Sequence, residues 1–272
     1  MQRRIPAVYM RGGTSKGVFF HTRHLPHDAD LRDRVILAVL GSPDPNRRQI
    51  NGLGGATSST SKVVMINPSG RPDHDVDYTF GQVSIDSPFV DYKGNCGNLS
   101  SGVGPFAVDE GLVQVKEPST QVRIYQVNTQ KTIVAEVPVR NGLSNEEGTF
   151  SIDGIPGTGG KIRLRFLDPG GSKTGALLPT GSPLDTLDLG PNGRIEVSIV
   201  DAANPSVFVR AHDIGLQGTE NADGELGPRA PGLLEDIRRH AACRLGFAST
   251  PEEAGESSQA VPKIVFCSSP QT

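Results

Sequence analysis

Glycine and proline are spread so densely along this chain that long uninterrupted helices are disfavoured. The 272 residues include 33 Gly and 21 Pro, which end helices and shape turns. Between them stand short apolar runs, and hydrophobic residues make up 35% of the chain. This pattern predicts a soluble, β-rich globular protein built from short elements. The length allows two domains or one large one.

Apolar periodicity predicts where the strands lie. Residues 5–10 and 17–20 form two short strands joined by the turn RGGTSK, and the apolar run VVMI at 63–66 forms a buried strand after the glycine-rich loop NGLGGATSSTSK. Further strands are expected at 120–138, 162–169 and 194–211.

Three segments have helical spacing. The first, 30–40, follows Asp28 and Asp30 as candidate caps; the second begins at Gly97 or Asn98, so that Cys96 lies at its N-terminus; the third spans 233–247. The predicted core faces are Leu31, Val35, Ala38 and Val39 in the first helix, and Leu233, Leu234, Ile237, Ala241 and Leu245 in the third.

The stretch 169–183, PGGSKTGALLPTGSP, gathers Gly, Pro, Ser and Thr without a period and therefore predicts a linker. We expect an N-terminal domain at 1–175 and a C-terminal domain at 176–272.

Several classes of protein lack support in the sequence. The net charge is -3 and no basic stripe is present, so we expect no nucleic-acid partner. A long apolar run and a signal-like N-terminus are both missing from the sequence, so we expect no membrane association and a cytoplasmic location. The three Cys are read as free thiols, with Cys243 and Cys267 in the core. Neither a zinc-binding HExxH pattern nor a nucleotide-binding glycine motif appears, and we predict no metal.

Lys62 is the first candidate for chemistry. It follows a loop of Gly, Ser and Thr at the entrance of a buried strand. If the loop encloses a cleft, loss of water would favour the neutral amine, which is a competent general base. The alternative is an ordinary solvated lysine at a strand edge.

Cys96 is the second candidate. It stands between Asn95 and Gly97 at a predicted helix N-terminus, where the helix dipole favours a thiolate that can exchange a proton. The alternative is a buried structural thiol.

Two glycine-rich loops, RGGTSKG at 11–17 and GLGGATSSTS at 52–61, are rich in N–H and hydroxyl donors that could hold carboxylates. Arg11 adds a bidentate carboxylate grip. The alternative is that the glycines only make tight turns.

The segments YMRGGTSKGVFF, INGLGGATSSTSKVVMI, DHDVDYTFGQVSID and GNCGNLSSGVGPFAV closely resemble the PrpF family of isomerases, and DAANPSVFV at 201–209 continues the match. The resemblance implies an α/β (α+β), diaminopimelate-epimerase-like fold of two domains, each a mostly antiparallel sheet around a central helix. It also implies that the second domain is incomplete, because family members usually continue well beyond Thr272. It assigns catalysis to Lys62 and Cys96 without a cofactor. The substrate contacts that it implies are Arg11, Gly13, Thr14, Ser15, Thr60, Ser61, Gly97, Asn98 and Asn204.

The implied activity is proton-transfer isomerisation of a small unsaturated tricarboxylic acid, 2-methylaconitate or aconitate. Alternatives within the family are a 4-oxalomesaconate tautomerase and a methylitaconate delta-isomerase. An alternative of another class is a non-catalytic tricarboxylate-binding or dehydratase-accessory protein. An amino-acid epimerase ranks lower, because only Cys96 among the cysteines has a fitting context. The resemblance is compatible with a homodimer.

Overall fold

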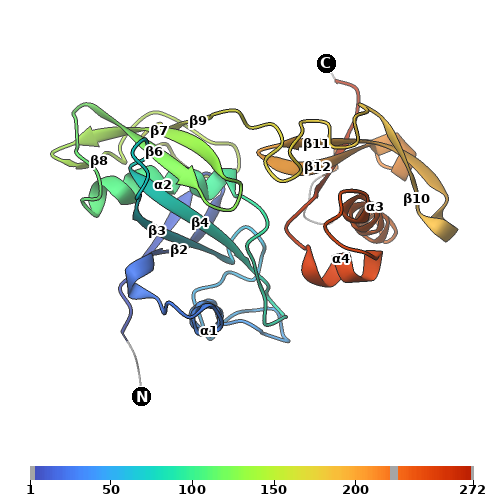
Figure 1. Cartoon of the computed structure of the whole chain (residues 1–272), viewed down its shortest axis with the longest axis horizontal. Coiled ribbons are helices and arrows are strands. Elements are labelled where there is room, and N and C mark those ends of the chain that lie inside the picture. Colours follow the sequence, from blue (N-terminus) through green and yellow to red (C-terminus); the bar gives the residue numbers. More distant parts are fainter. Residues whose placement is uncertain (1–3, 221–225, 271–272) are drawn as a thin grey trace. The chain divides into compact units, whose positions relative to one another are not determined.

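The computed structural model describes residues 4–220 and 226–270 (Figure 1). The chain divides into two units at the junction of Asp168 and Pro169, earlier than the boundary predicted after residue 175. The boundary lies earlier because the residues just after the junction form hydrogen bonds with β11 (Arg194–Ala202) and the turn that follows it, and so belong to the second unit. The Gly171 N–H donates to the carbonyl of Asp201 at 2.9 Å, and the Ala203 N–H donates to the carbonyl of Pro169 at 2.7 Å.

In the described part of the first unit, one mixed sheet has the strand order β1-β2-β3-β4-β6-β7-β8, with β5 paired to β4 and β9 paired to β7. The pairs β2–β3 and β4–β6 are parallel, and the other pairs are antiparallel. The strands are β1 (Val8–Gly12), β2 (Ser15–His21), β3 (Lys62–Pro68), β4 (Val76–Val83), β5 (Val90–Asp91), β6 (Ser119–Gln126), β7 (Lys131–Arg140), β8 (Leu143–Ser144) and β9 (Arg163–Phe166).

The first hairpin is tighter than predicted. Its strands reach Gly12 and begin again at Ser15, so the turn is formed by Gly13 and Thr14 rather than by all of RGGTSK. Gly13 has a φ of +50°, a left-handed conformation that glycine adopts without strain. The short turn brings both strands up to the residues that carry the candidate chemistry.

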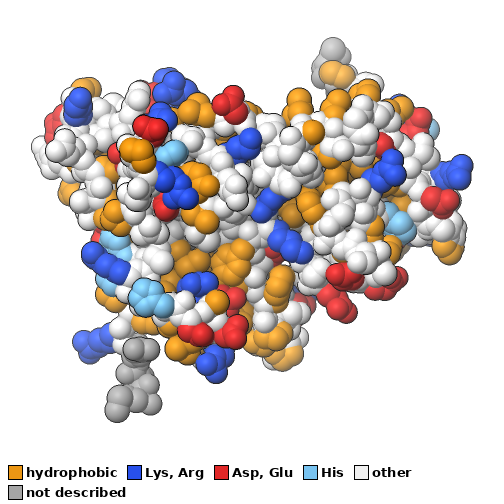
Figure 2. Space-filling view, viewed as in Figure 1, with side chains coloured by type: hydrophobic (Ala, Val, Ile, Leu, Met, Phe, Trp, Pro, Cys, Tyr) orange, Lys and Arg blue, Asp and Glu red, His pale blue; other side chains and the backbone are white. Residues whose placement is uncertain are grey.

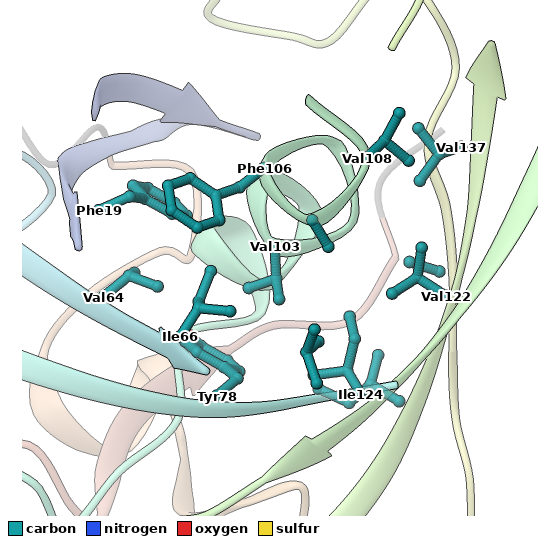
Figure 3. Close-up of a cluster of buried hydrophobic side chains, with 14 of the residues drawn as sticks. Phe19, Val64, Ile66, Tyr78, Val103, Phe106, Val108, Val122, Ile124 and Val137 are labelled. Carbon is teal, nitrogen blue, oxygen red and sulfur yellow. The ribbon is translucent and has the colours of Figure 1, made fainter. Parts of the chain in front are cut away.

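The curled sheet surrounds the helix α2 (Gly97–Asp109), and their shared core includes the fully buried Val103 and Ile124 (Figures 1 and 3). The sheet approaches closely because α2 carries glycine where it meets the strands. A Cβ on Gly104 would lie 2.6 Å from Cγ2 of Val137. The predicted start of this helix is confirmed, with Cys96 as its N-cap residue.

The opposite face of the sheet packs against α1 (Ala29–Leu40), which begins after Asp28 as predicted. The core residues of α1 are Ile36, Leu37 and Leu40. The predicted face was wrong, since Leu31 and Ala38 are exposed and Val35 and Val39 are only half-buried. Both the predicted face and the observed one have helical spacing, so the spacing alone could not distinguish them. Packing against the sheet decided which face is buried.

The second unit is a sheet of order β10-β11-β12-β13 packed on the helix α3. Ile237 and Ala241 of α3 are fully buried, so the predicted core stripe of this helix is confirmed at its centre. The elements of this unit are β10 (Asp185–Asp188), β11 (Arg194–Ala202), β12 (Asn204–Arg210), α3 (Ala230–Arg244), α4 (Pro251–Ser257) and β13 (Lys263–Cys267), with short 3-10 turns at Gly190–Asn192 and Ala211–Ile214. A further 3-10 turn, at Thr22–His24, belongs to the first unit.

The predicted core positions of the other two cysteines were not both correct. Cys267 is exposed because it ends β13, which lies at the edge of the described sheet. Cys243 is half-buried on α3, and burial raises the pKa of its thiol.

Candidate active site

Neighbouring strands of the first sheet place four residues in one row. Lys62 lies opposite Gln82 in the β3–β4 pair, and Gln82 lies opposite Asp91 in the β4–β5 pair. On the other side, a Cβ on Gly17 of β2 would be 2.7 Å from the carbonyl oxygen of Lys62. Residues directly opposite one another in a sheet project from the same face, so the side chains of Lys62, Gln82 and Asp91 share one face.

Strand alternation shows which face this is. Val64 and Ile66 of β3 belong to the core around α2, whereas Val63 and Met65 belong to the core against α1. Lys62 is two residues before Val64, so its side chain is on the α2 face. The first residue of the buried strand is therefore a lysine directed toward the side of the sheet that holds α2.

Lys62 is 7% exposed and is held by two contacts with β4. Its Nζ donates to Oε1 of Gln82 at 2.6 Å and lies 5.1 Å from the ring centroid of Phe80. The sequence interpretation missed Gln82, although its motif GQVSID was quoted. Only the register of β3 against β4 identifies Gln82 as the partner of Lys62, and that register cannot be read from the sequence.

Cys96 lies at the N-terminus of α2, half-buried, and its sulfur acts as the helix cap. The Sγ accepts the N–H of Leu99 at 3.4 Å. Cys96 packs against the core cluster that contains Tyr78, and burial raises the pKa of Tyr78 well above its ordinary value.

The hairpin of β1 and β2 lies against both the backbone of Lys62 and the first turn of α2. A Cβ on Gly17 would meet Cδ1 of Leu99 at 3.0 Å as well as the backbone of Lys62. A Cβ on Gly12 would lie 2.6 Å from the carbonyl oxygen of Asn98. Glycine is required at both positions for the backbones to approach so closely. The start of β3 and the first turn of α2 thus meet at this hairpin.

Polar groups of the hairpin and of α2 are linked by hydrogen bonds. Nδ2 of Asn98 donates to Oγ1 of Thr14 at 2.9 Å and to Oγ of Ser15 at 3.4 Å. Arg11 donates to the carbonyl of Gly13 at 2.7 Å. The helix N-terminus beside them is a favourable place for an anion, because its first N–H groups have no partner within the helix.

A cavity of about 470 Å³ brings together four of the predicted substrate contacts, Arg11, Gly13, Gly97 and Asn98. It follows one face of α2, and its lining also includes Phe150 and Ile152. A larger hollow of about 690 Å³ lies beside the segment from Gly41 to Asn51 and is lined by none of the predicted site residues.

The hydroxyls of Thr60 and Ser61 are engaged within the loop that precedes Lys62. Ser61 is fully buried and donates to Oε1 of Gln49 at 2.6 Å. The same oxygen accepts the N–H of Ala56 at 2.9 Å, so Gln49 holds both ends of the loop. Thr60 is bonded to Thr57 at 2.8 Å. Substrate contacts by these two hydroxyls stay predictions.

Asn204 belongs to the second unit, at the first position of β12. The neighbouring Asp201 is fully buried and anchors the segment after the junction by accepting from Oγ of Ser172 at 2.5 Å and from the N–H of Lys173 at 2.7 Å. Burial acts to raise the pKa of Asp201, but these bonds and those from Thr174 outweigh it and hold the pKa below its ordinary value. The contact of Asn204 with the substrate also stays a prediction.

On the face shown in Figure 2, basic and acidic side chains are interspersed. Within residues 4–220 and 226–270, the His, Cys, Asp and Glu side chains form no group of three or more that could hold a metal ion. None of the helices in these same ranges has the length and apolar character needed to span a bilayer.

The fold places the chain among isomerases with the diaminopimelate-epimerase-like fold, as the structural comparisons show. The crystal structure of methylitaconate-delta-isomerase matches with a TM-score of 0.72 and 50% identity, over 97% of this chain and 68% of that one. A probable proline racemase from Agrobacterium radiobacter matches with a TM-score of 0.51 over 89% of this chain and 60% of that one. Its 16% identity supports the fold alone.

The chain belongs to the PrpF family, whose model, "PrpF protein", matches residues 2–272. Among named relatives, the 3-methylitaconate isomerase of Eubacterium barkeri is 50% identical over 99% of this chain and 70% of its own length. The 2-methyl-aconitate isomerase of Cupriavidus necator is 46% identical over 97% and 70%. The 4-oxalomesaconate tautomerase of Pseudomonas putida is 44% identical over 99% and 72%. The chain is thus an isomerase of this family.

Proposed function

We propose that this isomerase moves a proton on a small unsaturated tricarboxylic acid, 2-methylaconitate or aconitate, with Lys62 as the base. The observation that carries the proposal is the position of Lys62. It is nearly buried, it is directed to the α2 face, and the hairpin that contacts its backbone also contacts the first turn of α2. A buried amine on the α2 face, at the start of a strand that meets the donor-bearing hairpin, suits proton abstraction from a bound carboxylic acid.

In this mechanism, neutral Lys62 takes a proton from the carbon next to the double bond and becomes an ammonium. The two electrons of the broken C–H bond spread over the allylic carbons and the attached carboxylate. Arg11, the hydroxyls of Thr14 and Ser15, and the N–H groups at the start of α2 would stabilise that charge. The double bond then rotates or migrates, and a proton returns to carbon from the lysine ammonium or from the thiol of Cys96.

A second candidate is the delta-isomerisation of methylitaconate. It is favoured by the 50% identity to the isomerase of Eubacterium barkeri. The third is 4-oxalomesaconate tautomerisation, supported by a relative at 44% identity. All three reactions require the same proton transfer, so they differ in the groups around the reacting carbons and leave the proposed role of Lys62 unchanged.

The test is proton NMR in deuterated water with trans-aconitate, 2-methylaconitate and 3-methylitaconate as separate substrates. The wild-type protein should isomerise at least one of them with deuterium incorporation, and Lys62→Met should lose at least about 10²-fold in turnover, the low end of what a positioned base contributes. Lys116→Met, at an exposed lysine of the same unit, is the matched control and should keep full turnover.

Full turnover by Lys62→Met would sink the scheme. If the wild-type protein binds these acids but exchanges no deuterium, the chain is a tricarboxylate-binding or dehydratase-accessory protein. In that case the affinity should depend on Arg11 and be indifferent to Lys62.

A further inference from the structure

The side-chain amide of Gln82 has its orientation set by three partners. Its Nε2 donates to the carbonyl oxygens of Ser58 and Ser61, at 3.1 Å each, and its Oε1 accepts from Nζ of Lys62 at 2.6 Å. A flipped amide would turn its oxygen toward these two carbonyl oxygens, which cannot donate a hydrogen bond. Only the observed orientation satisfies every group, and it directs the amide oxygen to the lysine.

The same amide ties the loop before Lys62 to β4. Ser58 and Ser61 precede Lys62 in the chain, and Ser61 also accepts the N–H of Val83, at 3.0 Å. Gln82 therefore contacts both the amine of Lys62 and the backbone that leads to it. Any shift of this amide would move the loop and the amine together.

The charge of the residue at position 82 matters as much as its shape. A carboxylate at the place of the amide oxygen would form an ion pair with Lys62 and favour the ammonium, which cannot act as a base. An amide accepts the same hydrogen bond without adding a negative charge. The other titratable side chains that neighbouring described segments bring to this end of the sheet are Lys16 on β2, Tyr78 on β4, Asp91 on β5 and Cys96 before α2.

We propose that Gln82 is the positioning residue for the catalytic base: its locked amide aims the amine of Lys62 on the α2 face, and its neutrality keeps that amine able to lose a proton. The inference rests on the proposed role of Lys62. It goes beyond that role because it gives a function to a second residue, Gln82, whose hydrogen bonds join β4 to Lys62 and to the loop before it. It also requires that the side chain at position 82 be uncharged.

The test compares kcat/KM as a function of pH for the wild type, Gln82→Glu and Gln82→Met. Gln82→Glu has nearly the same shape but adds a charge, so the pH below which activity falls should rise by about 1–3 units, with activity recovering above it. Gln82→Met keeps the length and removes the acceptor. It should lower kcat on the order of 10²-fold at every pH, with little change in KM, because the base is misplaced.

Gln121→Glu, an exposed glutamine on β6, is the matched charge control and should leave the pH profile unchanged. An equal loss at every pH in Gln82→Glu would overturn the proposal, since it would show a structural role alone. If Gln82→Glu does not fold, an unchanged kcat in Gln82→Met overturns it instead. Failure of this inference is distinguishable from failure of the proposed function, because Lys62→Met would still be inactive.

Discussion

The two helices that pack on opposite faces of the first sheet begin in different ways. At α1, the exposed carboxylate of Asp28 accepts the N–H of Leu31 at 2.8 Å, which is a strong cap. At α2, the sulfur of Cys96 accepts the N–H of Leu99 at 3.4 Å, and sulfur is a weak acceptor. The cap of α1 contributes to stability, whereas the start of α2 is weakly capped and surrounded by donors. The helix that begins at the candidate active site therefore has the weaker cap of the two.

The largest effect that would sharpen this comparison is on turnover. Cys96→Ser replaces sulfur with a better capping oxygen that is a much poorer acid, so the helix should keep its stability while turnover falls by about 10²–10⁴-fold if the thiol returns the proton. Thermal unfolding and the deuterium-exchange assay, run on the same sample, measure the two effects. Unchanged turnover would leave the lysine ammonium as the sole donor of the returning proton.

The second effect extends the comparison to a carboxylate that anchors a loop. Asp201→Asn keeps the shape but removes the negative charge to which the backbone N–H groups of Lys173 and Thr174 donate, and it should lower the free energy of unfolding by about 2–3 kcal/mol at neutral pH. Because the folded-state pKa of Asp201 lies below its ordinary value of 3.8, its contribution is present above that pH and is lost as the pH falls through the folded-state pKa. The difference between wild type and variant, measured by urea unfolding, should therefore shrink below about pH 4. A difference that is constant with pH would contradict this account.

The smallest expected effect is at the cap of α1. Asp28→Ala should lower the free energy of unfolding by about 1 kcal/mol, because it leaves the N–H of Leu31 without its side-chain acceptor. Turnover per folded molecule should not change, since α1 packs on the face of the sheet opposite to Lys62. Urea unfolding and the isomerase assay provide the two measurements. A loss of turnover as large as that expected for Cys96→Ser would show that the start of α1 also affects the chemistry, which contradicts the contrast between the two helices.

Local signals in the sequence predicted much of the first unit correctly. Asp28 as a cap, the start of α2 at Gly97 and the position of Lys62 at the beginning of a buried strand all depend on a few adjacent residues. The errors lie where distant segments decide the outcome. The core face of α1 was set by its contact with the sheet, and Cys267 is exposed because β13 lies at a sheet edge.

By itself, the sequence determined which residues carry donors, acids and bases, and where turns and helix ends interrupt the backbone, because these properties depend on residue type and near neighbours. Its motifs also determined the family. The tertiary structure alone decided that Gln82 faces Lys62, that Gln49 holds the loop before it and that Asp201 anchors the segment after the junction. Each of these contacts joins residues at least 12 positions apart, and strand register and chain packing, which no local pattern encodes, bring them together.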